Sequence, residues 1–295
     1  MNIMIIFQIL YDAYKNTKNL YRSIAGNNIK IDVTENEKSE LNKKHWNIYI
    51  LIELNSDLFI PKLPIHSPSW VPKFIKKILF GSNCKYLPDS IKDEDKICII
   101  YINGIMSNRD VVEVNRGELK KIFNRPIDVI HNVTDSFIMD ILECLIGKET
   151  NDLTEASTIT LYTVSKKLLD ININKVILIC HSQGTIIVSK VLQSLAKLGL
   201  DKEYYLKKLE IYAFANCASK MNYIVHNYPY MEHFANEDDF VARLGCNCSD
   251  EMKKYISIDG NVFIKENKSG HMFNSHYIDN FSNDYPTSKL NKYIK

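Results

Sequence analysis

The chain has 295 residues, of which 45% are hydrophobic and 24% charged, which is enough apolar sequence to bury the core of one large domain. Lysine and arginine number 37 against 35 aspartates and glutamates, and a formal net charge of +2 gives no electrostatic reason to expect a nucleic-acid partner. The 7 cysteines form no CxxC pair and no Cys/His set at zinc spacing, which predicts reduced thiols and no metal site.

The N-terminal third of the sequence is less regular than the rest. Residues 1–25 place apolar side chains at roughly helical spacing, which predicts a packed amphipathic helix. This run has no basic residue ahead of it and is too short to span a bilayer, so we expect no signal peptide, no transmembrane helix and a cytoplasmic protein. The segment 45–60 is rich in β-branched and aromatic residues and predicts one or two strands.

Prolines gather between residues 61 and 88, which excludes a helix interior or a central strand there and predicts an extended linker. Within it, "VPKFIKKILFG" (71–81) has aliphatic residues on one side and lysines toward the other. Such a stretch is typical of a surface helix with solvated lysines, and it is also compatible with transient contact to an anionic membrane surface. We therefore predict that residues 1–94 form an accessory segment ahead of the main domain.

From residue 96 onward, buried strand patterns alternate with helical patterns. "KICIIYING", for example, is a continuous apolar run, as expected of a strand buried on both faces. The predicted strands are 96–104, 126–132, 175–180, 209–216, 230–236 and a final one within "GNVFIKENKSGHMF", and the predicted helices are 109–123, 134–147 and 152–170. The alternation predicts an α/β fold over residues 95–295, with a mostly parallel central sheet and helices on both faces.

The stretch "VILICHSQGTIIVSK" (176–190) runs from a strand through a tight turn directly into a helix, with Ser182 at the apex. On such an elbow the apex side chain projects above the sheet from a strained backbone, and the following amides lie at a helix N-terminus, where negative charge is favoured. This predicts that Ser182 is a nucleophile and that the amide of Gln183 donates to an oxyanion. Gly184 would let strand and helix approach closely, whereas Cys180 is a mild departure from the G-x-S-x-G pattern.

The helix after the elbow should end at Gly199. The residues expected to face the sheet are Ile187, Val191, Leu195 and Leu198. His181, the neighbour of the serine, should point away from it and is not expected to act as the base.

A nucleophilic serine needs a base, and the base needs an acid that orients it. After an elbow of this type the acid and then the histidine follow along the chain. The predicted strand 230–236 runs into Asp238 and Asp239, and the final strand leads through a glycine turn to His271 and then to His276. On this pattern alone, both aspartates and both histidines are candidates.

Over roughly residues 95–280 the chain resembles the α/β-hydrolase superfamily, in particular lipase-like serine esterases of the fungal triacylglycerol lipase type. The resemblance rests on "CHSQG", on "DFVARL" and on "SGHMF". It implies that Ser182 is the nucleophile, Asp239 the orienting acid and His271 the base, in preference to the other aspartate and the other histidine.

The same resemblance implies a second oxyanion donor on the loop that ends the strand beginning at Lys96. "YINGIMSN" places Asn103 and Gly104 there, where the family often has His-Gly. It points to the amide of Ile105, with Gly104 allowing close backbone approach.

The resemblance implies a hydrolase of carboxylic esters, above all lipid or other small esters, that works through an acyl-enzyme with no metal or organic cofactor. The predicted helix 134–147 is either a mobile amphipathic lid that meets an acyl chain or an ordinary core helix. Two other functions stay open, namely an acyltransferase or thioesterase with the same triad and a non-catalytic scaffold. His226 and His233 are predicted to be structural, and the sequence leaves the oligomeric state open.

Overall fold

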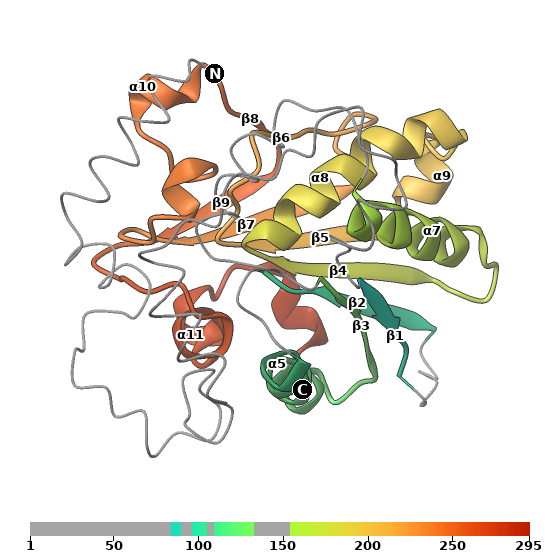
Figure 1. The fold of residues 1–295 in the computed structure, drawn as a ribbon, viewed down its shortest axis with the longest axis horizontal. Helices are drawn as coiled ribbons and strands as arrows, with labels where there is room; N and C mark the ends of the chain where they lie inside the picture. The colour runs from blue at the N-terminus through green and yellow to red at the C-terminus, as the bar shows by residue number, and fades with distance from the viewer. Residues whose placement is uncertain (1–83, 90–95, 105–108, 133–153) are drawn as a thin grey trace, which may run out of the picture.

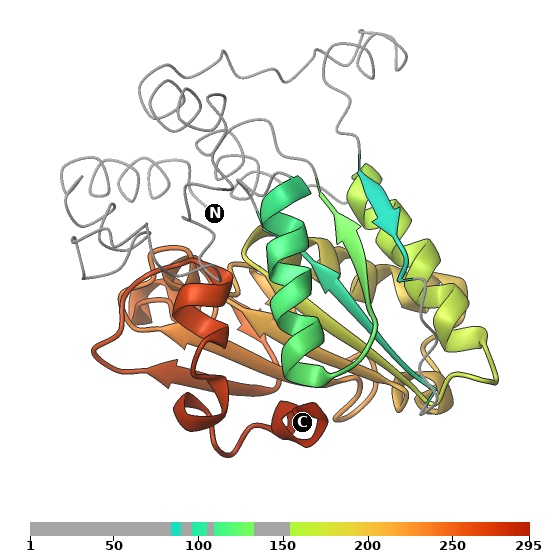
Figure 2. The ribbon, with the colours of Figure 1, turned by 90° about the horizontal axis from the view of Figure 1, so that it is seen from below.

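The computed structural model describes residues 84–89, 96–104, 109–132 and 154–295 (Figures 1 and 2). Seven strands in this part of the chain form one sheet in the spatial order β1-β3-β2-β4-β5-β7-β9. Every neighbouring pair is parallel except β1 and β3, which are antiparallel. Their bounds are Lys85–Leu87 (β1), Ile97–Ile102 (β2), Ile127–His131 (β3), Lys175–His181 (β4), Leu209–Phe214 (β5), Tyr230–Asn236 (β7) and Asn261–Lys265 (β9).

Helices cover both faces of this sheet, with α7, α8 and α9 on one face and α5 and α11 on the other (Figure 1). Their bounds are Arg109–Phe123 (α5), Glu155–Leu169 (α7), Gln183–Leu195 (α8), Glu203–Leu206 (α9) and Phe281–Asp284 (α11). The shorter elements are Ala196–Leu198 (η2), Ala242–Leu244 (η3), Asp250–Lys253 (α10), Phe273–Ile278 (η4), Lys289–Tyr293 (η5) and the paired strands Lys220–Met221 (β6) and Ser257–Ile258 (β8).

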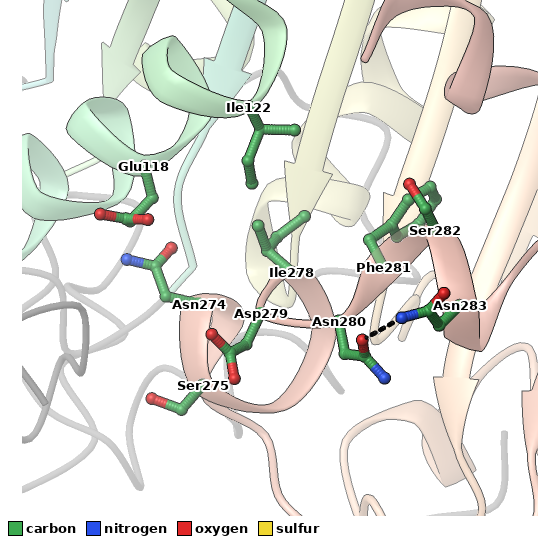
Figure 3. Close-up of a pocket in the computed structure, with 10 residues that line it drawn as sticks. All are labelled: Glu118, Ile122, Asn274, Ser275, Ile278, Asp279, Asn280, Phe281, Ser282 and Asn283. Carbon is green, nitrogen blue, oxygen red and sulfur yellow. Dashed lines mark hydrogen bonds between the residues drawn. The ribbon is translucent and has the colours of Figure 1, made fainter. Parts of the chain in front are cut away.

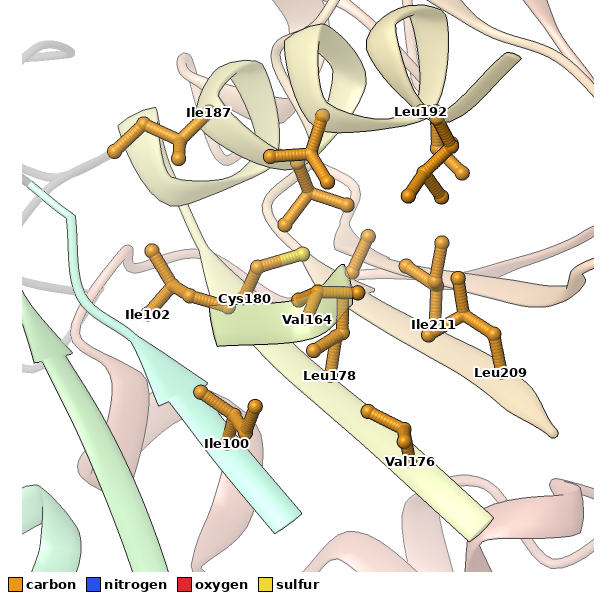
Figure 4. Close-up of a cluster of buried hydrophobic side chains, with 14 of the residues drawn as sticks. Ile100, Ile102, Val164, Val176, Leu178, Cys180, Ile187, Leu192, Leu209 and Ile211 are labelled. Carbon is orange, nitrogen blue, oxygen red and sulfur yellow. The ribbon is translucent and has the colours of Figure 1, made fainter. Parts of the chain in front are cut away.

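The central strand β4 sends its side chains alternately into two cores. Val176, Leu178 and Cys180 pack beneath α7 and α8 (Figure 4), whereas Ile177 and Ile179 pack on the side of α5 and η4. All five side chains are fully buried. A strand covered on both faces gains from an apolar residue at every position, which is why this stretch of sequence lacks polar alternation.

Two of the element boundaries lie at capping residues that the sequence supplies. The hydroxyl of Thr154 accepts a hydrogen bond of 3.1 Å from the amide of Ser157 and so starts α7. The segment formed by α8 and η2 ends at Gly199, which has φ of 68° and donates to the carbonyl of Ala196, as the predicted helix stop requires.

The predicted fold class is confirmed, with a mostly parallel sheet between two helical layers. The strand and helix predictions that fall on described residues correspond to β2, α5, β3, α7, β4, α8, β5, β7 and β9. Leu198 is a correction, because α8 ends at Leu195 and Leu198 lies in the following 3₁₀ turn, 54% exposed. Strand β1, at residues 85–87, pairs with β3, so the sheet begins before residue 95.

Several sequence predictions lie outside the described residues. They are the N-terminal helix 1–25, the strands in 45–60, the basic stretch 71–81 and the helix 134–147. Within the described ranges, no disulfide links the cysteines. A helix long and apolar enough to cross a lipid bilayer is likewise absent from those ranges.

Candidate active site

Ser182 lies between β4 and α8 with φ of 56° and ψ of −125°, a conformation that costs a non-glycine residue on the order of 1–3 kcal/mol. Its main chain is held on both sides. The Ser182 amide donates to the carbonyl of Phe214 over 3.0 Å, and the Ser182 carbonyl accepts from the amide and the hydroxyl of Thr185 over 2.9 and 2.7 Å. The serine hydroxyl does not cap α8, so its oxygen is not committed to the helix.

Two glycines let the end of β2 press against this elbow. A Cβ on Gly184 would lie 2.5 Å from the carbonyl oxygen of Ile102, and a Cβ on Gly104 would lie 2.6 Å from the Cβ of Ser182. Real Cβ atoms do not come this close, so neither position has room for a side chain. From its place in the elbow, Gly184 is predicted to ease packing between the elbow's own strand and helix, whereas the close approach is to the neighbouring strand β2.

The surroundings of Cys180 explain why this position can depart from the G-x-S-x-G pattern. Its side chain points into the core beneath α8 and is fully buried (Figure 4). Burial, with a smaller contribution from Cys217, raises the pKa of this thiol well above its usual range. The position therefore accepts a small apolar side chain, and the thiol is inert.

His271 and Asp239 form a buried pair at the same edge of the sheet. The Nδ1 atom of His271 lies 2.8 Å from Oδ2 and 3.1 Å from Oδ1 of Asp239, and the two residues are 5% and 0% exposed. An ionised carboxylate only accepts hydrogen bonds, so Nδ1 carries the proton and Nε2 is the basic nitrogen of the neutral ring. Such a pairing orients an imidazole for proton transfer at Nε2.

Two further donors fix the carboxylate of Asp239. The amide of Val241 donates to Oδ1 over 2.9 Å, and the buried hydroxyl of Tyr277 donates to Oδ2 over 2.6 Å. The Tyr277 oxygen in turn accepts from the amide of Asn236 over 3.1 Å. A buried carboxylate with this many donors is held in one position.

The alternative acid and the alternative base, Asp238 and His276, have different hydrogen-bond partners. Asp238 is exposed, and its amide donates to the carbonyl of Lys268. The Nδ1 atom of His276 accepts from the backbone amide of Met272 over 2.9 Å, so this nitrogen faces a peptide group where His271 faces a carboxylate. The structure thus brings together Asp239 and His271 and leaves the two alternatives outside this pairing.

Asparagines organise the side of the site where an oxyanion is expected. The Nδ2 group of Asn103 donates to the carbonyls of Gly104 and Asn132 over 2.7 and 2.9 Å, and the amide of Asn132 returns a hydrogen bond of 2.8 Å to Asn103 Oδ1. Asn132 also donates to Gln183 Oε1 over 2.6 Å. The ends of β2 and β3 are therefore tied to the first residue of α8. The predicted donor Ile105 lies outside the described residues.

Sequence reasoning missed Asn132 and Tyr277. Asn132 ends the predicted strand 126–132, and Asn103 lies at the end of the predicted strand 96–104, so the shared edge of the two strands was the available signal. Tyr277 carries a polar group on an aromatic side chain in the segment after His271, but no spacing rule links it to Asp239. His233 matches its predicted structural role, since its ring nitrogens bond to Asn216 Nδ2 and the carbonyl of Asp259.

A cavity of about 250 Å³ lies away from these residues, between α5 and the η4–α11 segment (Figure 3). The carboxylates of Glu118 and Asp279 and the polar groups of Asn274 and Ser275 contribute to its lining. None of the predicted site residues lines it. Apolar side chains complete a mixed lining, and because no predicted site residue borders this cavity, it is not assigned to the chemistry of Ser182.

No family model matches the chain, and no curated protein matches its sequence. Among solved structures, it is similar to a thermostable carboxylesterase cloned from a metagenomic library, with 10% identity, a TM-score of 0.45 and coverage of 72% of this chain and 89% of that chain. It is also similar to a hyperthermophilic esterase from the archaeon Pyrobaculum calidifontis, with 9% identity, a TM-score of 0.39 and coverage of 71% and 80%.

Ser182 follows β4, Asp239 follows β7 and His271 follows β9, so the three come from the same edge of the parallel sheet in the chain order Ser, Asp, His. A mostly parallel sheet between helical layers, a strained strand-to-helix elbow and this chain order are together the features of the α/β-hydrolase fold.

Proposed function

We propose that the protein is a serine hydrolase of carboxylic esters, with Ser182 as nucleophile, His271 as base and Asp239 as orienting acid. One observation carries the proposal. The Nδ1 atom of His271 is hydrogen-bonded to a buried carboxylate at the sheet edge where Ser182 stands in a strained conformation. Strain of this kind persists only where the surrounding structure enforces it, and it gathers at functional sites.

The mechanism follows from these roles. Nε2 of His271 takes the proton of the Ser182 hydroxyl as Oγ bonds to the ester carbonyl carbon, whose oxygen becomes an oxyanion. The amide of Gln183 at the start of α8 and the amide of Ile105 are the proposed oxyanion donors, and losing one such donor costs roughly 3–4 kcal/mol of barrier stabilisation.

The tetrahedral intermediate then collapses. The C–O bond to the alcohol breaks, the imidazolium gives its proton to the departing oxygen, and an acyl-serine remains. Water attacks this ester while His271 takes its proton, and the acid leaves with Ser182 restored. Through both halves Asp239 lies beside the transient imidazolium, and the donors Val241 and Tyr277 keep it in place.

Lipid esters are the substrate class we put first. The likeness of "CHSQG", "DFVARL" and "SGHMF" to lipase motifs supports this choice, and so do the amphipathic patterns at 71–81 and 134–147. In this proposal the part of the predicted segment 1–94 that precedes β1 bears on substrate access, and contact with a membrane surface is transient. An acyltransferase or thioesterase would use the same groups on another acyl donor or acceptor.

Labelling with a fluorophosphonate tests the nucleophile. Wild-type protein should be labelled, and Ser182→Ala should not. Ser194→Ala is the control and should be labelled like wild type, because the Ser194 hydroxyl donates to the carbonyl of Lys190 within the same helix. Hydrolysis of p-nitrophenyl esters of increasing chain length would then separate a lipase from a short-chain esterase. Wild type that resists labelling, also with lipid micelles present, would overturn the proposal in favour of a non-catalytic role.

A further inference from the structure

His181, the last residue of β4, contacts the loop that carries the base. Its Nε2 atom lies 2.8 Å from the backbone carbonyl oxygen of His271, and the side chain is buried. A carbonyl oxygen only accepts, so Nε2 of His181 carries a proton and donates it. The residue next to the proposed nucleophile therefore donates a hydrogen bond to the main chain of the proposed base.

This contact joins two segments that follow distant strands of the sheet. Strands β4 and β9 are separated by β5 and β7, which sets their axes about 14 Å apart at the usual strand spacing. The chain after β9 must return across the ends of β7 and β5 for His271 to come near Ser182. The hydrogen bond from His181 fixes the end of that return.

The rings of the two histidines also pack together. Their centroids are 4.6 Å apart with the planes tilted by 33°, and the ring of His181 lies 5.4 Å from that of Phe273. The ring also lies near the end of β2, because a Cβ on Gly104 would come within 3.2 Å of Nδ1 of His181. His181 is thus wedged between the end of β2 and the base loop.

The charge state of His181 suits this position. Burial lowers its pKa well below the ordinary value, the neighbouring His271 lowers it further and His276 adds a smaller effect, while the hydrogen bond to the His271 carbonyl acts in the opposite direction. A neutral ring is what the reaction requires, because His271 becomes a cation during turnover and a second cation beside it would raise the barrier.

We propose that His181 is a positioning residue, whose Nε2–H group sets the distance between His271 and Ser182 by holding the carbonyl of residue 271. The inference rests on the proposed function, since it assigns His181 a part in presenting that base to that nucleophile. His181 is assigned no proton transfer of its own, and its part is to hold the residue that carries one out.

Two substitutions separate the donor from the packing. In His181→Gln the side-chain amide can reach the place of Nε2 and donate to the same carbonyl, whereas His181→Phe keeps an aromatic ring but has no donor. We expect His181→Gln to stay within about threefold of the wild-type kcat and His181→Phe to lose roughly 10–100-fold in kcat with KM little changed, because small misplacements of a catalytic group are this costly. The rate of fluorophosphonate labelling should fall in parallel.

Equal kcat values for the two variants, with wild-type labelling rates, would overturn the positioning role while leaving the proposed function intact. Absence of labelling in the wild type would instead sink the proposed function. Should His181→Phe fail to fold, the tautomer of His181 decides the matter by ¹⁵N NMR of the wild-type protein. A proton on Nε2 supports the inference, and a proton on Nδ1 alone excludes it.

Discussion

At the scale of single residues, Gly184 sits where two backbone segments are almost in contact. The first turn of α8 lies so near the carbonyl of Ile102 that any side chain would overlap it. The sequence identified Gly184 through its place after Ser182, but it could not identify the opposing atom, because that atom belongs to β2. A glycine pattern thus predicts a close approach without naming its partner.

Gly184→Ala should destabilise the protein by about 1–3 kcal/mol, as overpacking does, and should slow fluorophosphonate labelling, because the elbow must shift away from β2. Gly117→Ala is the matched control. A Cβ on Gly117, in α5, meets nothing within 4 Å, so alanine should stabilise that helix by roughly 0.5–1 kcal/mol. Urea unfolding of both variants measures the difference, and equal stabilities would contradict the steric account.

At the scale of elements, the segment after His271 matters more than its sequence pattern suggests. The π-helix η4 places Tyr277 against Asp239, and the chain continues through α11 to Tyr285, which packs its ring on Phe234. The strand and helix periods were readable because burial repeats along each element. The wider turn of η4 and its hydrogen bonds leave no such repeat, which is why the sequence did not reveal the role of Tyr277.

Removing the hydroxyl groups of these two buried tyrosines should have opposite consequences. Tyr277→Phe takes one donor from the carboxylate of Asp239 and leaves the amide of Asn236 without its acceptor, so we expect a loss of about 1–3 kcal/mol and a lower kcat. Within the described residues the hydroxyl of Tyr285 has no hydrogen-bond partner, so Tyr285→Phe should be neutral or stabilising. Thermal unfolding and ester hydrolysis of both variants test this contrast, which would fail if Tyr285→Phe were the more damaging change.

At the scale of the whole molecule, buried titratable groups make stability depend on pH. His233 on β7 is fully buried, and burial lowers its pKa from 6.5 to about 4, against the opposing effect of the Asp259 carbonyl. Burial would raise the pKa of Glu210 on β5, but hydrogen bonds from Lys289, Tyr212 and Lys175 outweigh it and lower the pKa from 4.5 to about 2.

The sign is the same for both groups. The unfolded chain protonates His233 below pH 6.5 while the folded protein does not, so the free energy of unfolding falls from pH 6.5 to about 4, by up to about 3 kcal/mol. The contribution of Glu210, fully present above pH 4.5, is then lost as the pH falls toward 2.

Urea unfolding at a series of pH values checks this expectation. His233→Gln keeps a side-chain donor for the carbonyl of Asp259 but cannot titrate, so its stability should fall less between pH 6.5 and 4 than that of wild type. Parallel curves for wild type and His233→Gln would show that another group governs this range.

The strand order also determines when the parts of the site come into being during synthesis. Strands β1, β2 and β3 come from residues 85–131, and from β4 onward each strand joins the edge just formed, in the order β5, β7 and β9. A ribosome delivers the chain from its N-terminus, so the elbow serine emerges well before the histidine that follows β9. If Ser182 and His271 act as proposed, a nascent or prematurely ended chain has the nucleophile but lacks its base. Its serine becomes reactive only when β9 has joined the edge of the sheet.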